Sequence, residues 1–310
     1  PIDLVKVARK YFTPKSMSVT LMLNKDEQKQ LSERAFKEFN TDLSALLKAG
    51  AKAKLATKKE KAAPQKSIKI PLKLKGSSQE IIKERLSNGA LVILKRNVEI
   101  PTVSIKAGFL GGGRLENLGT QGVTYLLSNV WTAGSESYDE NKIASIVESC
   151  AGAISAFGGR NSVGLSLEAL SAYSDKAMAV FEDVLLKPAF PQEAIARELV
   201  VQREQIRTRA DHPSSVAAQM FMENIFEGHP YGLDQMGTLE SLKNLTRKEV
   251  AEHWAKSRSS DNAVFVAAGD INIDAQMKYF EELSSGLGRG KKQDHVFELD
   301  QIDDNKKIYQ

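Results

Sequence analysis

The order in which strand-like and helix-like patterns follow one another limits the fold most. Between residues 80 and 287, strand patterns come first, then two helices, two further strands, a long helical region and a final strand. Because strands and helices do not alternate one by one, this order argues against a doubly wound parallel sheet. It predicts an α+β domain with an antiparallel sheet flanked by helices.

Turn signals place the strands and helices within this domain. Asn88-Gly89 lies between apolar alternations and indicates a hairpin with a two-residue turn. Gly158 and Gly159 indicate a second turn, between two antiparallel strands. Further strands are expected over residues 102–110 and 262–268. Helices are expected over residues 120–131, 139–150 and 174–222, the last interrupted near Pro188, Pro191 and Pro213.

Composition limits the class of protein. The chain has 310 residues, of which 42% are hydrophobic and 26% charged, so it can bury a globular core and is neither collagen-like nor wholly disordered. Its one cysteine, Cys150, excludes an internal disulfide framework and a multi-thiolate metal site, and is predicted to lie in the core. No apolar run reaches the roughly 18 residues that span a bilayer.

Charge is concentrated in one segment. Residues 48–75 hold ten lysines and one acid, Glu60, for a net +9, whereas the rest of the chain carries −5 of the total +4. A nucleic-acid or anionic surface is one possible partner for such a segment. Because the segment has no aromatic residue and no arginine, a linker is favoured. Together with the amphipathic helix predicted before it, it forms a connecting region, residues 25–79.

The two ends of the chain resemble parts of a larger repeat. A helix and a strand predicted in residues 1–24 match the pattern of residues 250–268, with a two-residue change in length between them. Residues 1–24 are therefore interpreted as the end of a preceding related domain, although two unrelated helix-strand units remain an alternative. Residues 288–310 end in a strand-like pattern and are interpreted as a connector and the start of a following domain.

Few motifs carry recognisable chemistry. The run Gly111–Arg114 lacks the spacing of a phosphate-binding loop, so it is expected to form a close turn in which Arg114 and Glu116 make local ion pairs. No two histidines have the helical spacing of metal ligands, and His212 and His229, each before a proline, are expected in turns. The histidines are His212, His229, His253 and His295.

A longer succession of motifs is more specific. It comprises GGGRLEN, LGTQGVTYLLSNVWTAGS, AISAFGGRNSVGLSLEAL, RELVVQREQIR, GHPYG, GTLESLKNLTRKEVAEHW and SDNAVFVAAGDI. In this order the motifs resemble the pitrilysin/insulinase family of zinc metallopeptidases, the inverzincins. The resemblance covers residues 80–310, and residues 1–24 resemble the end of a preceding family domain. It implies the family's α/β roll for residues 80–287.

The resemblance also implies where a zinc site would stand. The family's His-x-x-Glu-His motif falls on Tyr125, Ser128 and Asn129, and the third ligand, a glutamate, falls on Glu204. The acidic position one helical face earlier is Arg197. A phenol, a hydroxyl and an amide cannot replace two imidazoles and a carboxylate base, so we expect a degenerate domain with no catalytic, cofactor-binding or metal-binding residues.

Such degenerate domains occur in the family as the non-catalytic half of a two-half peptidase. The resemblance then implies that zinc is bound by a catalytic half, on the same or a partner chain, and that a peptide or protein substrate is enclosed between the halves. The alternative is a non-enzymatic scaffold or regulatory homologue, like the non-catalytic subunit of mitochondrial processing peptidase or respiratory core subunits. No nucleic-acid partner and no membrane span are expected. The sequence leaves the compartment open, and only bacterial relatives of this layout point to the periplasm.

Overall fold

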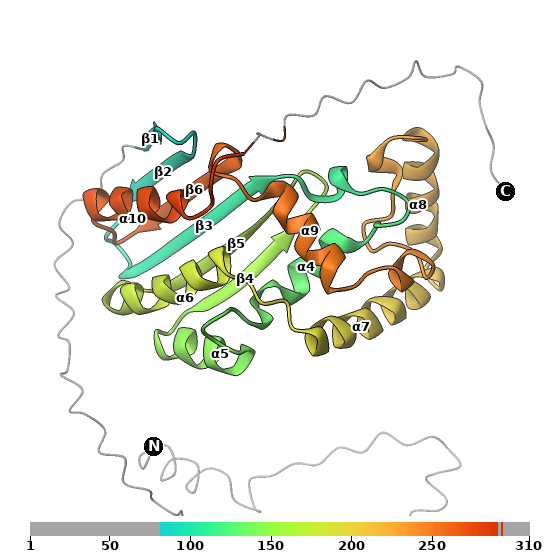
Figure 1. The fold of residues 1–310 in the computed structure, drawn as a ribbon, viewed down its shortest axis with the longest axis horizontal. Coiled ribbons are helices and arrows are strands. Elements are labelled where there is room, and N and C mark those ends of the chain that lie inside the picture. The colour runs from blue at the N-terminus through green and yellow to red at the C-terminus, as the bar shows by residue number, and fades with distance from the viewer. Residues whose placement is uncertain (1–80, 291–292, 294–310) are drawn as a thin grey trace, which may run out of the picture. The chain divides into compact units, whose positions relative to one another are not determined.

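The computed structural model describes residues 81–290 and residue 293. The predicted segments 1–24 and 25–79, and most of the predicted segment 288–310, therefore lie outside the described residues. Within them, one six-stranded sheet and seven α-helices form the domain (Figure 1). This is the α+β architecture predicted from the order of elements.

The sheet has the strand order β1-β2-β6-β3-β5-β4. The strands are β1 (Ile82–Arg85), β2 (Leu91–Arg96), β3 (Thr102–Leu110), β4 (Ala153–Gly158), β5 (Ser162–Leu170) and β6 (Ala263–Gly269). Every neighbouring pair is antiparallel, as predicted, apart from β2 and β6, which run parallel. Strand β6 comes from the far end of the described chain and lies between β2 and β3, parallel to the first and antiparallel to the second.

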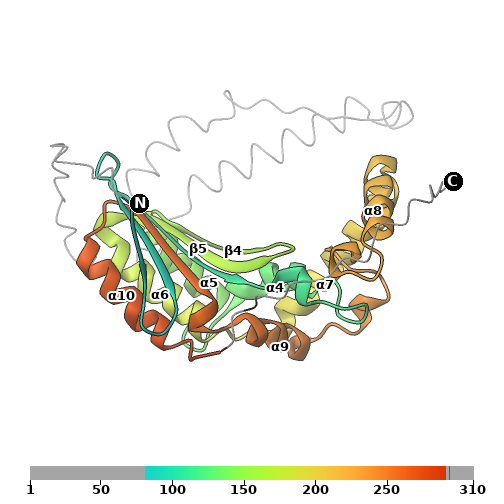
Figure 2. The same cartoon turned by 90° about the horizontal axis from the view of Figure 1, so that it is seen from above.

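Helices cover one face of the sheet (Figure 2). The seven α-helices of the described residues are α4 (Val123–Val130), α5 (Glu140–Ser149), α6 (Ser174–Leu186), α7 (Gln192–Ala210), α8 (Pro213–Ile225), α9 (Arg247–Ser257) and α10 (Ile273–Ser285). Helices α7 and α8 extend beyond the end of the sheet. Among the described residues, no helix combines the length and apolar character needed to cross a membrane.

Short polar residues define where several helices begin. The Asp139 carboxylate accepts a hydrogen bond from the Lys142 amide at 2.8 Å at the start of α5. Thr246 forms a reciprocal capping box with Glu249 at the start of α9. These side chains satisfy amides that have no partner within the helix, which explains why the helical patterns start there.

The first hairpin differs slightly from its prediction. Gly89 lies in the turn, as expected, with φ of 93°. The Leu86 amide donates to the Ala90 carbonyl at 2.8 Å, and the Gly89 amide donates to the Leu86 carbonyl at 2.9 Å. The loop between Leu86 and Ala90 therefore has three residues rather than two, and Gly89 supplies the positive φ that closes such a loop.

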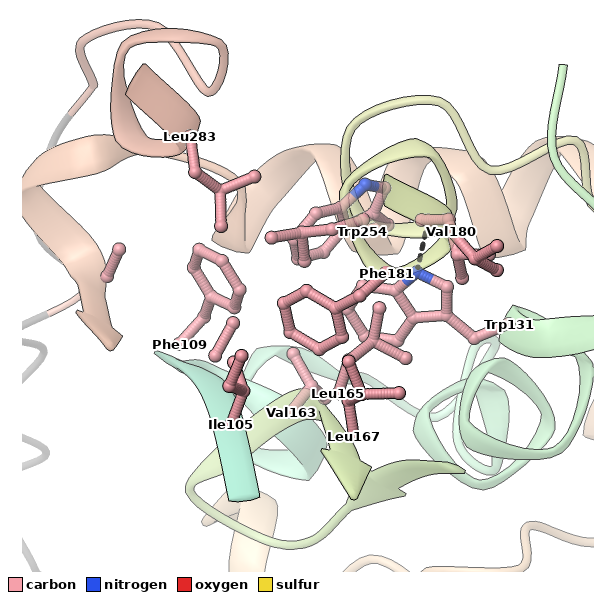
Figure 3. Close-up of a cluster of buried hydrophobic side chains, with 14 of the residues drawn as sticks. Ile105, Phe109, Trp131, Val163, Leu165, Leu167, Val180, Phe181, Trp254 and Leu283 are labelled. Atoms are coloured by element: carbon pink, nitrogen blue, oxygen red, sulfur yellow. Dashed lines mark hydrogen bonds between the residues drawn. The ribbon is translucent and has the colours of Figure 1, made fainter. Parts of the chain in front are cut away.

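The core lies between the sheet and its helices. Alternate residues of β3 and β5 are buried, among them Ile105, Phe109 and Leu165. Trp131 follows α4 and is fully buried, its ring 4.4 Å from that of Trp254, and its Nε1 donates to the Val184 carbonyl at 3.2 Å (Figure 3). Cys150 is also buried, as predicted.

We expect Trp131→Ala to destabilise this domain by about 3–5 kcal/mol, because it empties the volume of a buried indole. The free energy of unfolding, measured by urea denaturation, checks this value. Ile100→Ala is the matched control, since Ile100 is 65% exposed and its replacement should change stability by less than about 0.5 kcal/mol. Equal effects of the two substitutions would contradict the described core.

Candidate functional site

The start of α4 is held by a buried carboxylate. Glu116 accepts hydrogen bonds from the amides of Gly122, at 2.9 Å, and Thr124, at 2.8 Å. The first amides of a helix have no partner within it, and the helix dipole favours a negative group at this end. Glu116 therefore fixes the position of α4 from the loop that precedes it.

That loop makes the predicted close turn but not the predicted ion pair. The Gly113 amide donates to the Gly159 carbonyl at 3.0 Å, and a Cβ on Gly112 would lie 2.1 Å from the same oxygen. The backbone approach therefore requires glycine. The expectation that Arg114 pairs with Glu116 is wrong, because the Glu116 carboxylate binds backbone amides. Nε and Nη2 of Arg114 are buried without a hydrogen-bond partner among the described residues.

Two other helices contact the same turn of α4. Thr124 Oγ1 lies 2.9 Å from His253 Nε2, on α9. Gln202 Nε2, on α7, donates to the Gly122 carbonyl at 3.2 Å and to the Met236 carbonyl at 2.7 Å. Burial lowers the pKa of His253 to about 4, so this histidine is neutral near pH 7. Its position is structural, within a network around the start of α4.

The three residues expected at the family's motif positions, Tyr125, Ser128 and Asn129, lie on the outer face of α4, and each makes a hydrogen bond. Tyr125 Oη donates to Gln205 Oε1 on α7 at 2.8 Å. Ser128 Oγ and Asn129 Nδ2 both donate to the Tyr125 carbonyl, at 2.8 and 3.0 Å. Two of the three side chains are thus bonded to the backbone of their own helix, and the third to a neutral amide.

Glu204 does not join these residues. Its carboxylate is largely exposed and pairs with Arg207 one turn along α7, at 2.5 Å. Arg197, at the accompanying position, makes an ion pair with Glu140 on α5 at 2.9 Å. The residue of α7 that does contact the motif is Gln205, which the sequence reasoning missed. Consecutive residues of a helix point about 100° apart, so Glu204 and Gln205 face different directions. Only this difference in direction could have indicated that Gln205, not Glu204, faces α4.

These residues do not fit a zinc ion. Zinc requires imidazole, thiolate or carboxylate ligands, and the α4 face presents a phenol, a hydroxyl and an amide. Across residues 81–290 and 293, no three His, Cys, Asp or Glu side chains are grouped so that they could hold a metal.

An open strand edge lies next to α4. Strand β4 pairs only with β5 among the described strands, so its outer edge faces away from the sheet. A Cβ on Gly158 would lie 2.9 Å from the Thr124 carbonyl oxygen and 3.2 Å from Ser128 Cβ. The end of β4 and the motif face of α4 are therefore contiguous.

A cleft of about 700 Å³ lies on the other side of the Glu116 loop, between that loop and the segment that follows α8. Its walls include Leu118, Phe226 and His229, with Glu116 and Glu223 among its acidic residues. His229 accepts a hydrogen bond from the Tyr231 amide at 3.0 Å. His212, which is exposed, and His229 are the N-cap residues of α8 and of the short 3-10 helix Pro230–Gly232.

Most of the described domain matches a known protein family. Residues 91–239 match the model of the family described as insulinase, peptidase family M16. The chain is 26% identical over 208 residues to an uncharacterized zinc protease of Rickettsia bellii, covering 67% of this chain and 50% of that protein.

Other relatives differ in their described activity. The chain is 23% identical over 219 residues to the non-peptidase homolog YmxG of Helicobacter pylori, covering 70% of this chain and 51% of that protein. It is 24% identical over 221 residues to a probable mitochondrial-processing peptidase subunit beta of Schizosaccharomyces pombe, covering 67% of this chain and 48% of that protein. The chain thus spans about half the length of the curated relatives it matches.

Solved structures share the fold. A peptidase M16 inactive domain from Pseudomonas fluorescens superposes with a TM-score of 0.66 at 22% identity, covering 70% of this chain and 53% of that chain. A protease from Helicobacter pylori gives a TM-score of 0.62 at 18% identity, covering 69% of this chain and 52% of that chain.

The pKa values of Glu116 and His253, both buried near α4, are shifted in opposite directions, so we expect the two residues to change the stability of the domain with pH in opposite ways. Burial is the main cause that raises the pKa of Glu116 from 4.5 to about 7, so its contribution to stability falls as pH rises through that window. Burial lowers the pKa of His253 from 6.5 to about 4, so its contribution falls as pH falls from 6.5 to 4. Between pH 4.5 and 6.5 the two contributions offset one another.

Single substitutions should separate these contributions. As pH rises from 4.5 to 6.5, the stability of Glu116→Gln relative to the unsubstituted protein should increase by about 3 kcal/mol. Over the same range, the relative stability of His253→Gln should decrease by about as much. Urea denaturation at several pH values measures both differences. Differences that do not change with pH would show that neither group titrates as described.

Proposed function

Because residues 91–239 form a domain of the insulinase family, peptidase family M16, we propose that this protein is the non-catalytic half of a zinc metalloendopeptidase of the pitrilysin/insulinase type. In this role the described domain closes and lines the chamber that encloses a peptide substrate. The catalytic half, on the same or a partner chain, binds the zinc ion and carries out hydrolysis.

The observation that carries this proposal is the state of the α4 motif face. Tyr125 is bonded to Gln205, and Ser128 and Asn129 are bonded to the α4 backbone. Hydrolysis by a zinc peptidase needs a carboxylate that takes a proton from the metal-bound water. Ser128 stands where the family has this carboxylate, so the domain has the helix but lacks the catalytic base. This supports a role in enclosing substrate.

The surface next to α4 supports contact with an extended peptide. The outer edge of β4 offers backbone amides and carbonyls, to which a peptide can add as a further strand. Phe157, 37% exposed, lies on the uncovered face of the same strand, opposite Gly164. This edge and face are the described surfaces that we assign to the chamber wall.

The proposal includes a domain arrangement. Residues 1–24 end a preceding family domain, residues 25–79 contain the helix and lysine-rich linker that join the halves, and residues 288–310 lead into a following domain. The complete domain is residues 80–287.

A second function is a non-enzymatic scaffold or regulatory subunit. The similarity to the non-peptidase homolog of Helicobacter pylori favours it, since that relative is described as having no peptidase activity. The two proposals differ in whether a half with an intact His-x-x-Glu-His motif accompanies this chain.

We expect the purified 310-residue chain to contain substoichiometric zinc and to show no chelator-sensitive hydrolysis of a quenched fluorescent peptide library. Hydrolysis should appear only when the protein includes a catalytic half. Zinc by mass spectrometry and fluorescence with and without 1,10-phenanthroline are the measurements.

Glu204→Gln is the matched control. Because Glu204 pairs with Arg207 on the surface, this substitution should leave zinc content and assisted hydrolysis unchanged. Stoichiometric zinc in the chain, or chelator-sensitive hydrolysis by the chain alone, would refute the non-catalytic role. Absence of hydrolysis in the complete assembly would instead favour the scaffold.

A further inference from the structure

The cleft beside the Glu116 loop has no role in the proposed function. Its volume of about 700 Å³ falls within the range of small-molecule sites, roughly 300–1,000 Å³. Figure 1 shows the loop between β3 and α4 extending to the end of the domain at which α8 lies. The cleft lies there, between this loop and the segment after α8, and none of its lining residues belongs to a described strand.

The wall that follows α8 is preformed. The rings of Phe226 and Tyr231 lie 5.5 Å apart. Arg160, in the turn between β4 and β5, donates from Nη1 to the Tyr231 carbonyl at 2.5 Å. Asp234, a little further along the chain, is buried and forms an ion pair with Arg209 on α7. Because these contacts already fix the segment, a ligand in the cleft would not have to order it.

Much of the cleft wall is apolar. Leu118 contributes from the Glu116 loop, and Phe226 and Leu233 contribute from the segment after α8. Leu118 is 76% exposed. A ligand that covers such a side chain gains about 25 cal/mol for each Å² of apolar surface removed from water. The walls therefore suit a molecule with an apolar body.

The charge of the cleft is negative. Its acidic residues are Glu116, Glu223 and Glu227, and no lysine or arginine of the described residues lines it. Burial lowers the pKa of His229 from 6.5, so this histidine adds no positive charge near pH 7. Glu223 accepts a hydrogen bond from the uncharged amide of Gln219 at 2.8 Å.

Glu116 makes the same point from inside the wall. It is 6% exposed, and its carboxylate binds two backbone amides and, within residues 81–290 and 293, no cation. Burial raises its pKa to about 7, because the desolvated charge has no positive neighbour to offset the loss of water. A ligand cation in the cleft would supply that neighbour.

We propose that this cleft binds a small amphipathic amine, a molecule that carries a protonated amino group on an apolar body. The ammonium group meets the carboxylates that line the cleft, and the body covers Leu118 and Phe226. An extended peptide fits less well, because no described strand edge borders the cleft to pair with a peptide backbone. The site is separate from the motif face of α4 and does not rest on the proposed function.

Isothermal titration calorimetry of the 310-residue chain tests the proposal with three probes of similar shape. They are 4-phenylbutylamine, 4-phenylbutanol and 4-phenylbutyrate, which are cationic, neutral and anionic at pH 8. At this pH Glu116 is largely ionised, and the amine stays protonated. The amine should bind at least about tenfold more tightly than the alcohol, the ratio that one charge-assisted hydrogen bond produces. The anion should bind more weakly than the alcohol.

Substitutions separate the charge of the cleft from its apolar wall. Glu223→Gln combined with Glu227→Gln should weaken amine binding about fivefold and leave alcohol binding unchanged. Leu118→Ala should weaken both about threefold, because it removes apolar surface that either probe covers. Glu252→Gln is the matched control, since Glu252 is exposed on α9 and does not line the cleft. It should change neither affinity.

Equal affinities of the amine and the alcohol would overturn the proposal, as would amine binding that the double glutamate substitution leaves unchanged. Tighter binding of a blocked tetrapeptide that contains phenylalanine followed by lysine would also overturn it, because this result would assign the cleft to a peptide.

Discussion

The capped start of α4 is the interaction on which the candidate site depends. Glu116 binds the Gly122 and Thr124 amides, while His253 and Gln202 bring α9 and α7 to the same turn. The helix is therefore positioned by its N-terminus and by its neighbours, not by anything bound to its outer face. This explains how the fold is kept although the outer face of α4 carries Tyr125, Ser128 and Asn129 and no zinc-binding side chains.

Much of the fold follows from local sequence. The alternation in β3 and β5, the turn at Gly89 and the proline breaks around α7 each reflect a local constraint: burial of one sheet face, a positive φ, or a missing amide. The parallel pairing of β2 with β6 is a long-range consequence of topology. No local pattern distinguishes it from antiparallel pairing, which is why the prediction missed it.

The candidate site divides in the same way. That Tyr125, Ser128 and Asn129 cannot bind zinc follows from their side-chain chemistry alone. Which residue meets them depends on the rotation of α7 against α4, and this rotation brings Gln205 rather than Glu204 to Tyr125. Similarly, Glu116 looked like an ion-pair partner of Arg114, yet burial beside two unpaired amides gives it a capping role. Tertiary geometry decided both outcomes.

The central place of β6 has a consequence for biosynthesis. This strand is among the last elements of the domain to leave the ribosome, yet it separates β2 from β3 and completes the middle of the sheet. Until it arrives, β2 and β3 have no strand between them, and each presents an unpaired edge. During synthesis the nascent chain therefore passes through a stage in which the β1–β2 pair and the β3–β5–β4 sheet both lack their common neighbour, β6. Chaperone binding during synthesis would be most useful in that interval.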